Sequence, residues 1–204
     1  EHPVARPEAP VSKDNIVLLH SGYLYPQDRK PVALLEALAM LRRDGFLSGS
    51  RLSVRFRAPG DEGFLRSEAS RFGVSDLVQI EPPIPHKEAI REMREVNALL
   101  LVQGPRFRRQ IPAKAYEYLR SGRPILTMSP SDSEASKVAR LSGKSYRADM
   151  DSSIEIAQQL RRLVVDIEMG TVAKAGLADL SQFDRRKQAG QLATILSKVA
   201  VTSP

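Results

Sequence analysis

The chain has 204 residues, 42% of them hydrophobic, so it is long enough for one α/β domain with a sizeable core, or for one domain and an appendage. It contains no cysteine, which excludes a disulfide framework and a thiolate metal site, and its apolar runs are too short to cross a membrane. The 31 Lys and Arg residues outnumber the 24 Asp and Glu residues, and the net charge of +7 favours an anionic ligand or an anionic membrane surface.

Residues 1–14 contain three prolines and predict a linker or a trimmed interdomain segment. From Ile16 onward, short apolar runs alternate with amphipathic stretches, which is typical of βα units around a parallel sheet. We therefore predict a Rossmann-like α/β domain over residues 15–180, with about six strands flanked by helices, followed by a C-terminal helix and tail at 181–204. The strands that the pattern places are 16–20, 52–56, 77–80, 98–102 and 124–128. The predicted helices are 32–44, 65–72, 86–95, 112–121, 134–141, 152–168 and 181–199.

The segment 110–126 is the most informative part of the chain, because it reads as a loop, a short helix and a buried strand. Pro112 suits the first helical position, and Gly122 suits the position just past the helix end. The free N–H groups at the helix start favour a phosphate. Glu117 lies further along the helix, where its carboxylate can accept two hydrogen bonds from a ribose diol. The segment therefore predicts a nucleotide site.

The letters IPAKAYEYLRSGRPIL, residues 111–126, also resemble the signature segment in the C-terminal, donor-binding halves of GT-B glycosyltransferases of the group 1 type, family 4-like. Three further segments stand in the order that such domains use: IVLLHSGYLYPQDRKP, GVSDLVQIEPPIPHKEAIREM and NALLLVQG. The resemblance covers roughly Ile16 to Val165. It implies one half of a GT-B architecture, with the donor held at the carboxyl edge of the sheet.

The phosphate-binding residues that the resemblance implies begin at Gly22, which follows the first strand and would let backbone N–H groups approach a diphosphate. Arg29 and Lys30 are the basic residues that would grip it. Lys114 opposes the helix dipole near the start of its helix, so either a donor phosphate offsets its charge or it pairs with Glu117. The alternative for Glu117 is that ion pair, or one with Arg120.

Two further loops are candidates for the donor site. By resemblance, the backbone at Ile84 and Pro85 meets the nucleotide base, and His86 is expected to cap the following helix. The loop 103–110 holds three arginines whose clustering favours a diphosphate, with a solvated basic loop as the alternative. Arg109 stands where many family members have a second glutamate, and a guanidinium offers no acceptor for sugar hydroxyls.

The resemblance therefore implies a glycosyltransferase domain that uses a nucleoside-diphosphate sugar as substrate, needs no cofactor or metal, and retains the anomeric configuration. Its expected partner is an N-terminal acceptor-binding domain of the same protein, so we expect this chain alone to bind donor weakly and to transfer nothing. We expect a cytoplasmic location, possible association with an anionic membrane, and no nucleic-acid partner, because aromatic residues make up only 5%. Two alternatives remain open: a nucleotide-binding regulatory domain and a basic nucleic-acid-binding module.

Overall fold

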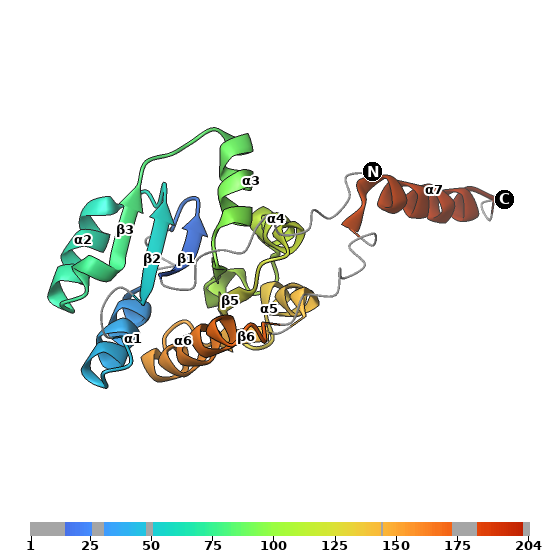
Figure 1. Ribbon diagram of the computed structural model, residues 1–204. Helices are drawn as coiled ribbons and strands as arrows, with labels where there is room; N and C mark the ends of the chain where they lie inside the picture. The colour runs from blue at the N-terminus through green and yellow to red at the C-terminus, as the bar shows by residue number, and fades with distance from the viewer. Residues whose placement is uncertain (1–14, 26–30, 48–50, 144, 173–182, 202–204) are drawn as a thin grey trace.

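The computed structural model describes residues 15–25, 31–47, 51–143, 145–172 and 183–201, and contains one parallel six-stranded sheet with the strand order β3-β2-β1-β4-β5-β6 (Figure 1). Its strands are β1 (Ile16–Ser21), β2 (Leu52–Arg57), β3 (Val78–Glu81), β4 (Ala98–Val102), β5 (Ile125–Met128) and β6 (Ser145–Ala148). This order and the parallel pairing confirm the predicted Rossmann-like α/β fold.

Helices cover both faces of the sheet, as parallel strands require. One face packs against α1 (Val32–Arg43), α2 (Glu62–Arg71) and α6 (Ser153–Glu168). The other packs against α3 (His86–Glu95), α4 (Ala113–Ser121) and α5 (Glu134–Ala139). Short 3₁₀ helices occupy Ser75–Leu77, Pro105–Phe107 and Arg140–Ser142. Each crossover between parallel strands therefore carries a helix, and the carboxyl ends of all six strands meet at one edge.

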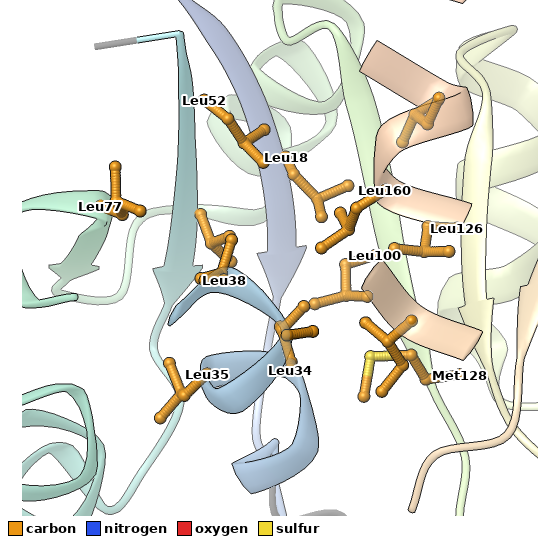
Figure 2. Close-up of a cluster of buried hydrophobic side chains, with 14 of the residues drawn as sticks. Leu18, Leu34, Leu35, Leu38, Leu52, Leu77, Leu100, Leu126, Met128 and Leu160 are labelled. Atoms are coloured by element: carbon orange, nitrogen blue, oxygen red, sulfur yellow. The ribbon is translucent and has the colours of Figure 1, made fainter. Parts of the chain in front are cut away.

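The core lies in two layers that the central strands divide. All five residues of β4 are buried, and they alternate: Leu100 faces the layer of α1 and α6, whereas Leu99 and Leu101 face the layer of α4 and α5. Figure 2 shows the first layer, where Leu34 and Leu38 of α1 lie close to the sheet beside Leu160 of α6. This two-sided burial fixes β4 at the centre of the sheet and rigidifies the edge that follows it.

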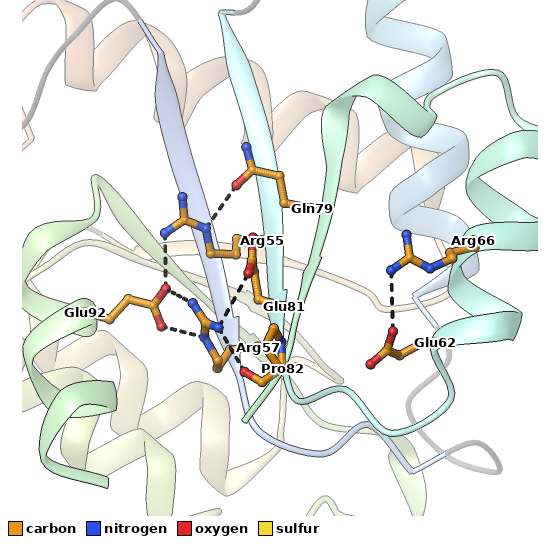
Figure 3. Close-up of polar contacts among 8 residues, drawn as sticks. All are labelled: Arg55, Arg57, Glu62, Arg66, Gln79, Glu81, Pro82 and Glu92. Carbon is orange, nitrogen blue, oxygen red and sulfur yellow. Dashed lines mark hydrogen bonds and ion pairs between the residues drawn. The ribbon is translucent and has the colours of Figure 1, made fainter. Parts of the chain in front are cut away.

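Strand β2 has one apolar and one polar face. Leu52, Val54 and Phe56 are buried in the core, as their alternation predicts. Such alternation is typical of a strand with one solvent-exposed face, but on the polar face of β2 Arg55 and Arg57 reach Glu92 of α3 in an ion-pair network (Figure 3). The polar face of β2 is therefore covered through charged contacts.

Several element boundaries differ from the predicted ones. Strand β6 was not placed by the sequence pattern, although the predicted number of strands requires it. Pro112 is the N-cap of α4 with an extended ψ of 140°, so its predicted place at the first helical position is wrong by one residue. Its φ of −66° suits either position, and only ψ distinguishes them.

The C-terminal helix α7 (Arg185–Val201) lies apart from the helices that cover the sheet (Figure 1). Leu192, Ile195, Leu196 and Val199 are exposed on it. Phe183, just before α7, makes an edge-to-face contact with Tyr116 of α4, at 4.9 Å between ring centroids. In the part of the chain that the structure describes, no helix is both long and apolar enough to span a membrane.

Candidate functional site

The candidate site lies where the direction of strand order reverses, between β1 and β4. β1 pairs with β2 over six residue pairs, from Ile16 to Ser21, but with β4 only at Leu18–Ala98 and Leu19–Leu99. Beyond these two pairs the carboxyl ends of β1 and β4 are no longer joined by the ladder. Open α/β sheets bind ligands at such a switch point, outside the carboxyl ends of the strands.

Gly22 begins the loop after β1 and has a φ of +99°, which L side chains rarely adopt. Its N–H donates to the carbonyl of Arg57 at 2.8 Å, and the N–H of Leu24 donates to the carbonyl of Pro59 at 2.9 Å, so the loop is tied to the end of β2. A Cβ at position 22 would lie 3.4 Å from Nζ of Lys114. The glycine therefore brings bare backbone next to an ammonium group.

Helix α4 approaches this loop with its N-terminal end. Pro112 precedes it, and among the described residues no side chain caps its first amides. Gly122 ends the helix in the left-handed conformation with a φ of 69°, as the sequence predicts. The dipole of α4 therefore places partial positive charge beside Gly22 and Lys114.

Two residues of α4, Lys114 and Tyr118, are four positions apart and so share one helix face, where they contact the end of β1. Nζ of Lys114 is 3.2 Å from Nε2 of His20. The hydroxyl of Tyr118 accepts a 2.9 Å hydrogen bond from the N–H of Ser21. Complete burial raises the pKa of Tyr118 well above its usual value, so this hydroxyl is neutral. These contacts fix α4 against the strand end.

Replacing Tyr118 with phenylalanine is expected to lower the free energy of unfolding by about 1–3 kcal/mol, because the buried N–H of Ser21 loses its acceptor. Thermal unfolding should register a decrease of a few degrees. The matched control is Tyr116→Phe, which removes a hydroxyl from the same helix and keeps the ring contact with Phe183. Equal melting temperatures for the two variants would contradict the assigned role of the Tyr118 hydroxyl.

The carboxylate of Glu117 lies at the open side of α4, with 33% of its side chain exposed. Its Oε1 is 3.8 Å from Nε2 of His86, a distance too long for a hydrogen bond, and the His86 side chain is 77% exposed. Glu117 is thus neither buried nor held by a close hydrogen bond to His86. The prediction that His86 caps α3 is wrong, because Pro85 occupies the N-cap and His86 is the first helical residue.

Of the remaining predicted site residues, some lie near Glu117, one is exposed in the loop before α4, and two are not described by the structure. Ile84 is partly buried and Pro85 is exposed, and both directly precede His86, so the loop after β3 borders Glu117. Arg109 is exposed in the loop before α4. Its neighbour Arg108 forms an ion pair with Asp132 at 3.7 Å, so part of the arginine cluster has a partner within the chain. Arg29 and Lys30 lie outside the described residues.

His20 was not singled out from the sequence. It is completely buried at the end of β1, and its ring contacts both β4 and α4. An apolar run that ends in histidine was a weak signal, since nothing in the sequence shows that Lys114, 94 residues later, reaches it. Within the described ranges, no group of three or more His, Asp or Glu side chains is arranged to hold a metal ion.

Comparison with known proteins identifies the fold. Neither a protein-family model nor a curated protein matches the sequence. Among solved structures, α,α-trehalose 6-phosphate synthase from Burkholderia multivorans is 17% identical with a TM-score of 0.64, and the match covers 93% of this chain and 44% of that one. HepE from Anabaena, solved in complex with UDP, is 15% identical with a TM-score of 0.61, covering 91% and 49%.

A third match is the C-terminal domain of the group 1 glycosyltransferase LpcC from Francisella tularensis, at 13% identity and a TM-score of 0.60, covering 85% of this chain and 87% of that domain. The chain thus spans less than half the length of the trehalose 6-phosphate synthase and of HepE, but most of the LpcC domain. The described chain has the fold of the C-terminal domain of GT-B glycosyltransferases of the group 1 type.

Proposed function

We propose that the chain binds a nucleoside-diphosphate sugar at the carboxyl edge between β1 and β4, and serves as the donor-binding half of a glycosyltransferase. The observation that carries this proposal is the convergence of the Gly22 backbone, the Lys114 ammonium and the start of α4 at one point, with the Glu117 carboxylate one helical turn further along α4. The positive charge lies at the Gly22 and Lys114 end of this arrangement, and the partly exposed carboxylate of Glu117 lies at the other end.

Each end of the arrangement suits a different part of such a donor. The diphosphate would lie against Gly22 and Lys114, where backbone approach, an ammonium and a helix dipole act together. Glu117 would accept hydrogen bonds from the ribose hydroxyls, as an acidic residue does in dinucleotide folds. The loop at Ile84 and Pro85, which borders Glu117 through His86, would face the base. Arg109, Arg29 and Lys30 stay predicted phosphate ligands.

In the proposed reaction, the bond between the anomeric carbon and the diphosphate oxygen breaks, and its electron pair leaves with the nucleoside diphosphate. A new bond forms from an acceptor hydroxyl oxygen to the anomeric carbon, and the hydroxyl proton is released. The chain would accelerate this step by stabilising the charge that develops on the leaving diphosphate. Acceptor binding and retention of the anomeric configuration would require the complete enzyme with both domains. Association with an anionic membrane also stays a prediction.

A thermal-shift panel of UDP, GDP, ADP and dTDP, each free and as a sugar conjugate, tests the proposal. At a ligand concentration of a hundred times Kd, binding stabilises the folded state by about 2.7 kcal/mol. For a chain of this length that corresponds to a rise in Tm of roughly 5–10 °C. We expect the ligands that carry one of the four bases to raise Tm more than those that carry the others. No stabilisation by any nucleotide would contradict the proposal.

The same panel separates the alternatives. A regulatory nucleotide-binding domain has no need to distinguish sugar conjugates, whereas a donor domain should respond to the attached sugar. A nucleic-acid-binding module should ignore free nucleoside diphosphates and bind oligonucleotides with an affinity that falls steeply with salt. Strong, salt-sensitive oligonucleotide binding without a nucleotide response would replace the proposed function with the second alternative.

A further inference from the structure

His20 occupies the gap that opens between β1 and β4 beyond their last residue pair. Its side chain is completely buried, and its Nδ1 lies 3.0 Å from the carbonyl oxygen of Leu100 on β4. The ladder between these strands ends one residue earlier, at Leu19–Leu99. The imidazole therefore continues the connection between the strands with a side-chain hydrogen bond, at the point where the proposed phosphate site begins.

The hydrogen bonds of the two His20 ring nitrogens, to Leu100 and to Lys114, determine its tautomer. A carbonyl oxygen only accepts, so Nδ1 must carry the hydrogen that is donated to Leu100. An ammonium only donates, so Nε2, 3.2 Å from Nζ of Lys114, must be the unprotonated acceptor. His20 is thus neutral and held in a single tautomer, with its one remaining lone pair directed at Lys114.

The main effect of this hydrogen bond is to fix the position of the Lys114 ammonium. A lysine side chain has four rotatable bonds and loses roughly 2 kcal/mol of rotamer entropy when it is fixed in one geometry. The hydrogen bond to His20 holds its Nζ beside the backbone of Gly22, 3.4 Å from where a Cβ would stand. Because the ammonium is already in place, a phosphate that binds there need not order it.

We propose that His20 is a positioning residue for the phosphate-binding ammonium of Lys114, acting through its neutral Nδ1–H tautomer. This inference rests on the proposed function, since it assigns His20 a part in the same donor site. It makes His20 a determinant of affinity for the diphosphate without contact with the donor. It also predicts that His20 acts only through Lys114, so that its contribution disappears when Lys114 is absent.

The test is a double-mutant cycle on this chain, with affinity measured by titration calorimetry against UDP and the other nucleoside diphosphates of the panel. Lys114→Met removes the ammonium and keeps most of the side-chain volume, and His20→Leu removes the hydrogen bonds of the ring to Leu100 and Lys114. Each single variant is expected to weaken binding by about tenfold or more, because a hydrogen bond to a charged group is lost or its donor is no longer held in place. The double variant should bind about as well as Lys114→Met alone.

A conservative variant and a spectroscopic measurement separate positioning from a merely structural role. His20→Gln keeps an acceptor for the ammonium and should recover most of the affinity that His20→Leu loses. The ¹⁵N spectrum of His20 should show an unprotonated Nε2 in the wild type. Far-UV circular dichroism and Tm of each variant without ligand verify folding, and if His20→Leu does not fold, His20→Gln and the spectrum carry the test.

The possible results separate this inference from the proposed function. Wild-type binding with additive losses in the cycle, or with a protonated Nε2, would overturn the role of His20 and leave the donor site standing. Unchanged affinity in a folded His20→Leu variant would do the same. Failure of the wild type to bind any nucleotide of the panel would remove the phosphate site itself, and with it the role of His20.

Discussion

Replacement of Glu117 with alanine is expected to weaken nucleoside-diphosphate binding by about 30-fold or more, since two hydrogen bonds from the ribose to a charged acceptor are lost. The carboxylate is well placed for this, because 33% of its side chain is exposed and its contact with His86 is as long as 3.8 Å. Titration calorimetry of wild type and variant with the preferred nucleotide measures the loss directly.

Ligand chemistry provides the sharper form of this test. A 2′-deoxy nucleotide lacks one of the two hydroxyls, so the wild type should prefer the ribonucleotide and Glu117→Ala should lose that preference. Glu95→Ala is the matched control, because Glu95 is an exposed glutamate at the last residue of α3 and pairs with Arg91 at 2.7 Å. A Glu117→Ala variant that still distinguishes the two sugars would show that the ribose lies elsewhere.

Removal of the Glu92 side chain is expected to produce the largest loss of stability, about 3 kcal/mol, because Glu92 is the closest counter-charge to both partly buried guanidinium groups, and Arg57 retains only a longer contact of 3.7 Å with Glu81. The Glu92 carboxylate lies 2.8 Å from Arg57 and 3.1 Å from Arg55. Only 12% of the Glu92 and Arg57 side chains is exposed, so solvent screens this contact weakly. For Glu92→Ala we expect Tm to fall by roughly 6–12 °C.

Figure 3 also shows the control for this measurement, the pair of Arg66 and Glu62 on α2. Its atoms are 3.4 Å apart, and 63% and 49% of the two side chains is exposed. Exposed ion pairs between residues four apart on a helix contribute about 0.3–0.5 kcal/mol. Glu62→Ala should therefore lower Tm by no more than about 2 °C. Similar losses for Glu92→Ala and Glu62→Ala would mean that the network around β2 does not stabilise the fold.

The network also predicts how stability depends on pH. Burial raises the pKa of Glu92, but hydrogen bonds from Arg57 and Arg55 outweigh it and hold the pKa below its usual value. A carboxylate whose folded-state pKa is depressed stabilises the protein above its unfolded pKa and loses that contribution as the pH falls through the folded value. The wild type should therefore lose more stability on acidification below about pH 4.5 than Glu92→Gln does.

The fold followed from the sequence wherever hydrophobic patterning was strong. The predicted bounds of β4 agree with the structure to the residue, because five consecutive apolar residues are typical of a parallel strand covered on both faces. β6 was not located from the sequence because it has only four residues. Of these, Tyr146 and Ala148 are buried, and so short an alternation cannot be distinguished from a loop. The alternation in β2 shows which of its residues are polar, but it does not show that Glu92 of α3 covers the polar face.

The candidate site was predicted in part, and for local reasons. The helix-stop glycine at 122 and the proline before α4 located Lys114 and Glu117 on a short helix, and Gly22 was found as a turn residue after a strand. His20 could not be found in this way, because its role depends on two contacts that span 80 and 94 residues of sequence. Contacts between side chains far apart in the sequence produce no periodic pattern from which they could be predicted.

The short seam between β1 and β4 divides the sheet into two three-stranded halves, β3-β2-β1 and β4-β5-β6. Gly22 belongs to the first half, whereas Lys114 and Glu117 lie on the helix that links β4 to β5. A ligand bound at the carboxyl ends of β1 and β4 would contact both halves, at the strand pair with the fewest paired residues in the sheet. A bound ligand would therefore add contacts between the two halves and stabilise the folded domain across this boundary.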